Sequence, residues 1–437
     1  MSRMPPGPSS VVLNTVGVFR EPYEHLVRCA QRYGDPYTLP HVFGQMVMTG
    51  HPDGVRAVFS ADPDIYDVPG VELSIPLLGE SSLILVQGAT HREARKLLTP
   101  PLHGERMEAY GELMRDTTVR HGERWQRDVP FTMQETAEAI SLEVIVRTVF
   151  GANESEHVRR YGQALIASMR TRSIAIYFKP LRRELFGLTK WAKFQRALKE
   201  ADDLIYAEIA AARRAPSGSR EDILSLLLSA RHENGEPMSE REIRDQLMTL
   251  VLAGYDATAT LVTFACYLLH EHPGALERLR VELEGAGANP APKAIVRLPY
   301  LEAVCQEALR MYPILGSVIR LLKRPMTLMG YEIPAGKIVA ASAAIAHRRE
   351  ETFPDAQSFK PERFLDQPPL SPFEYFPFGG GARRCIGAAF ALYEMKIVLA
   401  TLIRNFRLRL LPGQRVRPIV RGVTVLPEGG VKMMLAS

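Results

Sequence analysis

One short stretch, residues 378–387, restricts the folds open to this chain more than any other. It reads Phe-Gly-Gly-Gly-Ala-Arg-Arg-Cys-Ile-Gly, so a glycine-rich turn delivers a single cysteine to the start of a helical pattern. Apolar residues recur at helical spacing from 388 to 404. Cys385 is therefore expected where unpaired N–H groups and the positive end of a helix dipole favour a thiolate. The glycines allow the backbone to approach a flat ligand closely.

Three ordinary interpretations compete for this stretch. A lone cysteine is most often a small buried hydrophobe. A glycine-rich loop before a helix can hold phosphate, but the Lys-Ser/Thr ending of a P-loop and the glycine spacing of a dinucleotide site are both absent. A nucleophilic cysteine needs a histidine base, whose proximity is not visible in sequence. The combined spacing of Phe378, Gly381, Arg383, Cys385 and Gly387 resembles the heme-ligand loop of the cytochrome P450 family.

Length and composition are compatible with a large globular protein. A chain of 437 residues suggests two to three domains of about 150 residues each, although large single domains are common. The hydrophobic fraction of 46% suffices for a core, and 24% charged residues is ordinary for a soluble globule. The net charge is +5 without a dense Lys/Arg tract, which disfavours nucleic acid as a partner. Basic residues could instead help to dock an acidic redox protein.

Cysteine usage and hydropathy predict a cytoplasmic protein without a membrane anchor. The four cysteines, at 29, 266, 305 and 385, form no metal-type CxxC pair, and a chain of this size needs no disulfides. The first residues contain no signal-peptide core. The longest apolar runs, such as 338–346, are far shorter than the roughly 18 residues of a membrane span.

The expected elements are mostly helices, joined by a small amount of strand. A hairpin is predicted from 37–40 and 45–49, and strand-like sequence recurs at 331–341 and 423–425. Residues 62–87 are expected to be irregular, and loops of this length often cover a binding site. The expected helices are 23–33, 53–60, 107–127, 136–150, 157–172, 189–214, 239–272, 299–311 and 388–404.

Two basic residues, His91 and Arg95, are four apart and share one face of a predicted helix. The pair alone is compatible with a solvated basic face. It is also compatible with a clamp on an anionic group, since arginine offers a planar fork to a carboxylate. In the family that the chain resembles, a helix at this point binds the heme propionates, and these two residues match it.

The helix predicted at 239–272 has two irregularities near its centre. It opens with the capping-box form Ser-Glu-Arg-Glu, and roughly 30 residues would give a rod of about 45 Å. Gly254 costs about 1 kcal/mol relative to alanine inside a helix, and Asp256 interrupts an apolar stretch. Either the helix bends at the glycine or something approaches its backbone there.

This centre resembles the oxygen-binding helix of cytochromes P450, which is written Ala/Gly-Gly-x-Asp/Glu-Thr-Thr/Ser. Ala253, Gly254, Asp256 and Thr258 match that pattern, whereas Ala257 replaces the usual first threonine. The resemblance implies that Asp256 and Thr258 serve proton delivery. It leaves open how delivery proceeds with alanine at 257.

A pair three residues apart, Glu307 and Arg310, falls on a further helix. Alone, the two residues would be read as a surface ion pair of little energetic value. Arg363 lies in a downstream Pro-Glu-Arg-Phe segment that resembles the second arginine segment of the family. The resemblance implies a buried ionic network of Glu307, Arg310 and Arg363 that fixes the cysteine loop from behind.

The remaining site residues are implied by the same resemblance. Arg320 is expected to hold a heme propionate, and Phe378, Arg383, Gly387, Ala253 and Gly254 to adjoin the cofactor. An apolar substrate pocket is expected, suited to a terpenoid, a fatty acid or a steroid. Its predicted lining is Ile75, Leu83, Leu250, Ile314, Leu315, Val318 and Val423.

The fold implied by the resemblance is mainly α with a small β-rich lobe, a helical triangular prism that holds heme between the long helix and the cysteine helix. A single domain is expected over 1–437, with the β-rich lobe at about 35–60 and 315–345. The helical heme-binding core is expected at about 88–312 and 350–410.

The function implied is insertion of one oxygen atom from O2 into an apolar molecule by a monomeric enzyme with heme b. Electrons would come from a ferredoxin or flavodoxin that an NAD(P)H-dependent reductase reduces, and the Cys385 thiolate would favour O–O cleavage. A peroxide-driven or isomerising heme-thiolate enzyme and a non-enzymatic heme gas sensor remain as alternatives.

Overall fold

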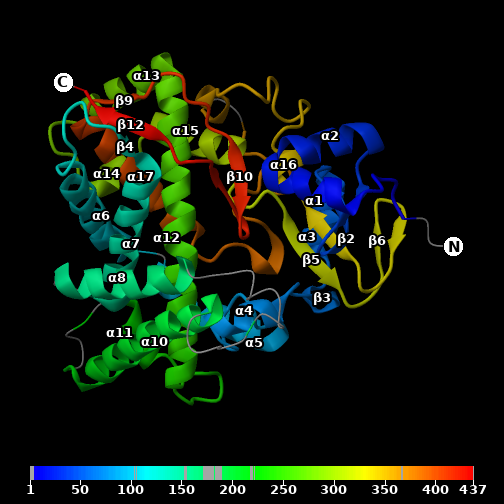
Figure 1. Ribbon diagram of the computed structural model, residues 1–437, viewed down its shortest axis with the longest axis horizontal. Coiled ribbons are helices and arrows are strands. Elements are labelled where there is room, and N and C mark those ends of the chain that lie inside the picture. The colour runs from blue at the N-terminus through cyan, green and yellow to red at the C-terminus, as the bar shows by residue number, and fades with distance from the viewer. Residues whose placement is uncertain are drawn as a thin grey trace. The chain divides into compact units, whose positions relative to one another are not determined.

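The computed structural model describes residues 4–102, 104, 106–151, 155–170, 182, 189–216, 220, 222–365 and 368–436. Its contacts divide the chain into two compact units. The first comprises Met1–Pro69, Gly111–Glu138 and Ala257–Ser437, and the second comprises Gly70–Tyr110 and Ala139–Asp256. The colours of Figure 1 follow the chain through both units.

The first unit contains a five-stranded sheet in the order β1-β2-β8-β5-β3. Only β2 and β8 run parallel, with Val47 opposite Val339, and every other neighbour in this sheet is antiparallel. The sheet therefore joins the start of the chain to a segment almost 300 residues later. Its strands are β1 (Tyr37–His41), β2 (Gly44–Thr49), β3 (Tyr66–Asp67), β5 (Val318–Leu322) and β8 (Ile338–Ala341).

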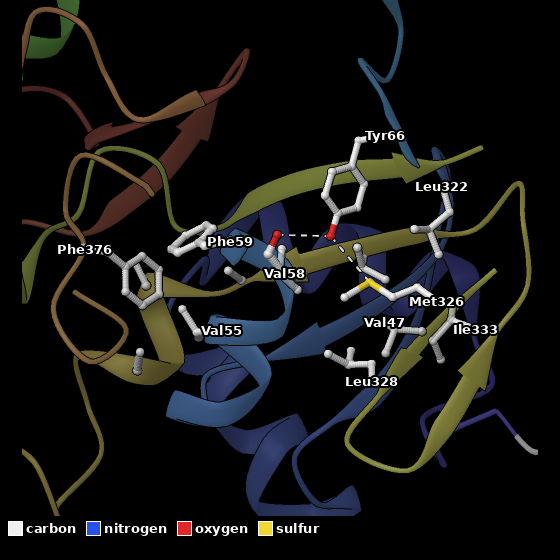
Figure 2. Close-up of a cluster of buried hydrophobic side chains, with 14 residues drawn as sticks. Val47, Val55, Val58, Phe59, Tyr66, Leu322, Met326, Leu328, Ile333 and Phe376 are labelled. Carbon is white, nitrogen blue, oxygen red and sulfur yellow. Dashed lines mark hydrogen bonds between the residues drawn. The ribbon is translucent and has the colours of Figure 1, made fainter. Parts of the chain in front are cut away.

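Helix α3 (Pro52–Ser60) and this sheet enclose a core of buried side chains (Figure 2). Val55, Val58 and Phe59 of α3 belong to it. The Tyr66 hydroxyl donates to the Val58 carbonyl at 3.0 Å, so its one polar atom is satisfied inside the cluster. The rings of Phe59 and Phe376 make an edge-to-face contact at 5.2 Å between centroids, which brings the segment just before the cysteine loop against α3.

Three small sheets complete the strands of the first unit. They are the hairpin β6–β7, the hairpin β10–β11 and the three-stranded sheet β4-β12-β9. Their strands are β4 (Phe131–Thr132), β6 (Met326–Leu328), β7 (Tyr331–Ile333), β9 (Leu408–Leu410), β10 (Pro418–Arg421), β11 (Thr424–Pro427) and β12 (Lys432–Leu435). The helices with all their residues in this unit are α1 (Val11–Arg20), α2 (Glu24–Tyr33), α3, α13 (Pro273–Gly285), α14 (Pro292–Ile295), α15 (Pro299–Met311), α16 (Ala343–Ala346) and α17 (Ala388–Asn405).

The second unit is helical in the residues that the structure describes. Tyr161 on α8 stacks on Phe150 at 5.0 Å between ring centroids, and its hydroxyl donates to the Leu204 carbonyl of α10. Its helices are α4 (Val71–Leu78), α5 (Gly88–Leu98), α8 (Ser155–Arg170), α10 (Lys190–Arg214) and α11 (Ile223–Ser229). The boundary between the units falls inside α6 (Arg106–Gly122), α7 (Met133–Phe150) and α12 (Glu240–Glu271).

Helix α12 begins with the predicted capping box. The Glu242 N–H donates to the Ser239 hydroxyl at 3.2 Å, and the Glu242 carboxylate accepts from the Ser239 N–H at 2.8 Å. Among the described helices, α12 alone is long and apolar enough to cross a membrane, and 72% of that apolar window is buried within the protein. Such burial is typical of the core helix of a folded protein.

The described elements are mainly helices with small sheets, as predicted, but three expectations about elements are wrong. Residues 62–87 are not irregular throughout, because they form β3 and α4, whose internal Pro76 conceals its helical pattern. Helix α1, capped by the Ser10 hydroxyl, and helix α13 were not expected. The helix expected to reach 127 ends at Gly122, where a side chain would collide with Phe406 at 2.2 Å. The last two residues expected in α8, 171–172, lie outside the described residues.

Candidate functional site

The cysteine loop, residues 378–385, is a closed turn that ends three residues before the first residue of α17. The Cys385 N–H donates to the Phe378 carbonyl at 2.9 Å, and the Gly379 N–H donates to the Phe376 carbonyl at 2.9 Å. Gly379 and Gly381 have φ of +69° and +65°, a backbone conformation that favours glycine. The loop is therefore shaped by its own backbone hydrogen bonds and by glycine.

Two glycines of this loop touch helix α3. A Cβ added at Gly380 would lie 2.3 Å from the Phe59 ring, and one at Gly381 would lie 2.4 Å from the Phe59 carbonyl oxygen. The approach of the loop backbone to a flat ligand stays a prediction, because these contacts concern only the side of Gly380 and Gly381 that faces α3. The two glycines let the loop seat directly on α3.

Exposure separates Cys385 from the other three cysteines. Cys29, Cys266 and Cys305 are buried, whereas Cys385 is exposed. Burial raises the pKa of Cys266 to about 12 and also raises the pKa of Cys305 and of Cys29. Thiolates are the form that binds metal, so Cys385 is the cysteine of this chain suited to be an iron ligand.

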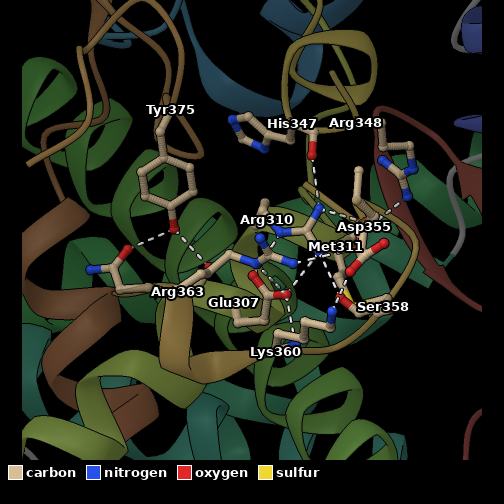
Figure 3. Close-up of polar contacts among 12 residues, drawn as sticks. Glu307, Arg310, Met311, His347, Arg348, Asp355, Ser358, Lys360, Arg363 and Tyr375 are labelled. Atoms are coloured by element: carbon tan, nitrogen blue, oxygen red, sulfur yellow. Dashed lines mark hydrogen bonds and ion pairs between the residues drawn. The ribbon is translucent and has the colours of Figure 1, made fainter. Parts of the chain in front are cut away.

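Arg310 on α15 has every donor satisfied in a fully buried position (Figure 3). Its Nε and one terminal nitrogen donate to the Glu307 carboxylate at 2.6 and 2.8 Å. Its other three N–H groups donate to the carbonyls of His347, Ala356 and Ser358 at 2.8, 2.8 and 3.2 Å. These five bonds equal the donor capacity of a guanidinium.

Glu307 collects charge and hydrogen bonds from two further residues. Arg363 donates to its carboxylate at 3.0 Å, and the Lys360 backbone N–H donates to it at 2.9 Å. The side chains of Glu307 and Arg310 are 0% exposed and that of Arg363 is 6% exposed. The reading of Glu307 and Arg310 as a surface ion pair is therefore wrong.

Sequence reasoning missed His347, which contacts both this network and the segment before the cysteine loop. Its carbonyl accepts from Arg310, and its Nε2 accepts from the Phe376 N–H at 3.1 Å. Phe376 in turn accepts from the Gly379 N–H. Tyr375 adds a second link, because its hydroxyl donates to the Gln306 carbonyl of α15 at 2.8 Å. No motif in the sequence marks either residue.

We expect the urea midpoint to fall more steeply below about pH 6.5 in this protein than in a His347→Gln variant. Burial, with the charges of Arg310 and Arg348, holds the pKa of His347 well below its ordinary value. Well above pH 6.5, neither the folded nor the unfolded chain binds a proton at this ring. Below it the unfolded chain binds a proton that the folded chain excludes, which favours unfolding by up to about 1.4 kcal/mol per pH unit.

The comparison isolates His347 because the glutamine oxygen can still accept from the Phe376 N–H. Urea unfolding at several pH values between 5 and 8 measures the two slopes. The other histidines are unchanged in the variant, so their contributions cancel in the difference. Equal slopes would show that the folded protein does not hold the His347 ring in its neutral form.

Arg320 on β5 is half-buried and is suited to an anionic ligand. Its guanidinium donates to the carbonyl of its neighbour Ile319 at 2.9 Å, and no carboxylate among the described residues pairs with it. Burial lowers the pKa of its guanidinium, so its charge is held at a cost. A cofactor that carries carboxylates fits the position of Arg320. The exposed thiol of Cys385 is suited to bind the iron of such a cofactor.

The candidate residues of the second unit lie on α5 and α12. His91 is buried and Arg95 is half-buried, four residues apart on α5. Gly254 packs against α7, since an added Cβ would lie 3.1 Å from Ile145 Cδ1. Ala253 is exposed and Asp256 is half-buried on the same turn of α12. In the first unit, the α12 residue Ala257 is half-buried and Thr258 is 1% exposed.

The residues predicted to line a substrate pocket differ in exposure. In the first unit, Ile314 is buried, whereas Leu315 and Val423 are 45% and 76% exposed. The Val425 N–H donates to the Ile314 carbonyl at 2.8 Å, so the hairpin β10–β11 contacts Ile314. The others are half-buried (Val318 in the first unit, Ile75 in the second) or buried (Leu83 and Leu250 in the second unit).

Comparison with known proteins points to one family along almost the whole chain. The family model described as Cytochrome P450 matches residues 4–434. The chain is 33% identical to the Mycobacterium tuberculosis protein designated cytochrome P450 135B1, over 98% of this chain and 91% of that protein. It is 34% identical to cytochrome P450 137 of the same species, over 93% of this chain and 84% of that protein.

Solved structures agree with these sequence matches. A structure titled as retinoic acid bound cyanobacterial CYP120A1 superposes with a TM-score of 0.86 at 26% identity and covers 100% of both chains. The cytochrome P450DA heme domain superposes equally well at 21% identity, over 99% of this chain and 97% of that chain, which supports the fold alone. The predicted fold class is thereby confirmed. With the exposed cysteine at its matching loop, the chain belongs to the cytochrome P450 family, whose general activity is heme-thiolate monooxygenation.

Proposed function

We propose that this protein binds heme b through Cys385 and inserts one oxygen atom from O2 into an apolar small molecule. The observation that carries the proposal is the exposed Cys385 in a glycine-shaped loop before α17, in a chain whose other cysteines are buried. When bound, the heme supplies the activation of dioxygen, to which the thiolate contributes electron density.

The residues of the chain hold and orient the reactants. Arg320 would pair with a carboxylate of the cofactor, which the fit of its half-buried guanidinium supports. His91 and Arg95 would take the same role, by resemblance. Asp256 would relay protons at its carboxylate. Phe378, Arg383, Gly387, Ala253 and Gly254 are proposed to adjoin the cofactor.

An apolar substrate of the terpenoid, fatty-acid or steroid class fits the predicted pocket residues. The similar cyanobacterial structure is described as binding retinoic acid, a terpenoid with a carboxylate. Its identity with this chain is only 26%, so the likeness supports the substrate class and not the compound. Terpenoids are therefore the first class to test.

Electrons are proposed to come from a ferredoxin or flavodoxin with an NAD(P)H-dependent reductase. This assignment rests on the resemblance and on the net charge of +5, which suits an acidic partner. We further propose that residues 1–437 form one domain of this family, monomeric and cytoplasmic.

Reconstitution with a surrogate ferredoxin and its reductase tests the proposed function. Retinoic acid, a long-chain fatty acid and a steroid are supplied with NAD(P)H under ¹⁸O2, and a product with one ¹⁸O atom is expected. Product formed only when peroxide replaces the electron donor would favour a peroxide-driven enzyme. An isomer without added oxygen would favour an isomerase, and the absence of any product would favour a gas sensor.

We expect this protein to release more hydrogen peroxide per NAD(P)H than its Ala257→Thr variant. Alanine at 257 offers no hydroxyl to position water for proton delivery, and Thr258 is rotated by about 100° on a 3.6-residue helix. General acid–base groups typically contribute about 10²–10⁴-fold, so an unreplaced loss should be measurable. Product and peroxide per NAD(P)H are compared with those of Thr258→Ala. Unchanged coupling in Ala257→Thr for several substrates would show that position 257 does not limit proton delivery.

A further inference from the structure

Four buried polar side chains interrupt the apolar surface of α12 close to its N-terminal end. Arg244, Asp245, Gln246 and Thr249 are 5%, 2%, 2% and 4% exposed. Buried polar groups cost free energy unless they are hydrogen-bonded. Their partners therefore show what these side chains hold.

All four bind the segment 77–83, which covers the end of α4 and the start of its connection to α5. Asp245 accepts from the Ser81 N–H at 3.0 Å. Gln246 makes two hydrogen bonds to the backbone of the segment. Its oxygen accepts from the Leu83 N–H at 3.1 Å, and its nitrogen donates to the Ser81 carbonyl at 2.5 Å. The Thr249 hydroxyl lies 2.7 Å from the Ser82 hydroxyl.

The contact is tight enough to require glycine at position 79. Gly79 has φ of +80°, and a Cβ added there would lie 1.9 Å from the Asp245 carboxylate. Arg244 braces the arrangement, since it donates to the Leu77 carbonyl at 3.4 Å and to Asp245 at 3.0 Å. The opposite side of its guanidinium pairs with Asp202 at 2.6 Å.

The arrangement holds charge at a cost. Burial raises the pKa of Asp245 and of Asp202, against the opposing effect of Arg244. Apolar side chains at these positions could join the segment to α12 without that cost. Directional hydrogen bonds to Ser81 and Leu83 instead specify one conformation of the segment. Leu83, which belongs to this segment, and Ile75, which precedes the segment by two residues, are proposed to line the substrate pocket.

We propose that Arg244, Asp245, Gln246 and Thr249 are positioning residues that clamp the segment 77–83 onto α12 and thereby set how fast an apolar ligand leaves the site. The inference deepens the proposed function and rests on it, because the lining role of Ile75 and Leu83 belongs to that proposal. Loops that cover a site set ligand exchange when their opening is slow.

Hydrogen–deuterium exchange of the heme-loaded protein tests the clamp directly. Thr249→Val removes the hydroxyl contact to Ser82, and Gln246→Leu removes both bonds to Ser81 and Leu83. Thr263→Val is the matched control, because Thr263 is another buried threonine of α12 whose hydroxyl bonds its own helix, at the Ala259 carbonyl.

At about 0.5–1.5 kcal/mol per hydrogen bond, we expect amide exchange at 81–83 to rise about 2- to 10-fold in Thr249→Val and about 10-fold or more in Gln246→Leu. Exchange there should stay unchanged in Thr263→Val. Unchanged exchange in both clamp variants overturns the proposal. Because this measurement needs no turnover, its result stands apart from the outcome of the oxygenation assay.

Dissociation of 4-phenylimidazole, an apolar azole whose binding shifts the heme absorption band, tests the effect on ligand exchange. Stopped-flow dissociation should be faster in Thr249→Val and Gln246→Leu by factors similar to those for amide exchange, and unchanged in Thr263→Val. Faster amide exchange with unchanged azole dissociation overturns the role of the clamp in ligand release.

Discussion

Replacing Cys385 by alanine should abolish the red-shifted absorption band that the reduced protein is expected to show under carbon monoxide. That band reports a thiolate bound to heme iron, and an alanine has no atom that can bind iron. The backbone bond from residue 385 to the Phe378 carbonyl does not depend on the side chain, so the loop should keep its shape. Absorption spectra of both proteins, reduced and saturated with carbon monoxide, make the measurement.

The other cysteines provide matched controls within the same chain. Burial raises the pKa of the thiols of Cys29, Cys266 and Cys305 and so disfavours the thiolate that iron requires. The control variants are Cys29→Ala, Cys266→Ala and Cys305→Ala. All three variants should retain the band. A protein that shows the band of histidine ligation, or a Cys385→Ala variant that keeps the thiolate band, would contradict the assignment of the iron ligand.

The cysteine loop could be predicted from sequence because its determinants are local. The turn is closed by hydrogen bonds between residues at most ten apart, and glycine supplies the positive φ at 379 and 381. The helix that follows carries Ala391, Met395, Val398 and Leu402 at helical spacing, although the structure buries every residue from Glu394 to Ile403. The contact of Gly380 and Gly381 with Phe59 could not be predicted, since nothing in the loop itself reveals it.

The Glu307–Arg310 pair shows where sequence reasoning fails. Its spacing is that of any exposed helical ion pair, and the sequence contains no information on burial at that position. Burial arises because residues 347–363 return to α15 and offer carbonyls and Arg363 to the pair. The resemblance to a family supplied this network, whereas His347, which lies outside the family motifs quoted from the sequence, was missed.

The segment 77–83 illustrates a second cause of failure. It lies in the stretch 62–87, whose proline, glycine and serine residues predict an irregular loop and so conceal α4. Its conformation is instead fixed by side chains of α12 about 160 residues later in the chain. Those side chains read as polar interruptions of a core helix until their partners are known.

Replacing Glu307 by alanine should lower the free energy of unfolding by about 3–5 kcal/mol and impair heme incorporation. The substitution leaves Arg310 and Arg363 without their shared carboxylate at positions that are 0% and 6% exposed. It also removes the acceptor of the Lys360 N–H. Release of Arg310 would loosen its bonds to His347, whose ring accepts from Phe376 at the entry to the cysteine loop. Loss of stability and loss of heme should therefore occur together.

A second ion pair of the same spacing separates this effect from the loss of any glutamate. Glu277 and Arg280 are also three residues apart on a helix, but Glu277 is 69% exposed and lies 3.8 Å from its partner. Glu277→Ala should change the unfolding free energy by no more than about 0.5 kcal/mol and leave heme content intact. Urea unfolding and the ratio of heme to protein absorbance measure both effects. Equal stability and heme content in the two variants would mean that the buried carboxylate neither balances the two arginines nor supports the cysteine loop. Because Arg310 uses all five of its donors, Arg310→Lys should resemble Glu307→Ala, since an ammonium group has only three.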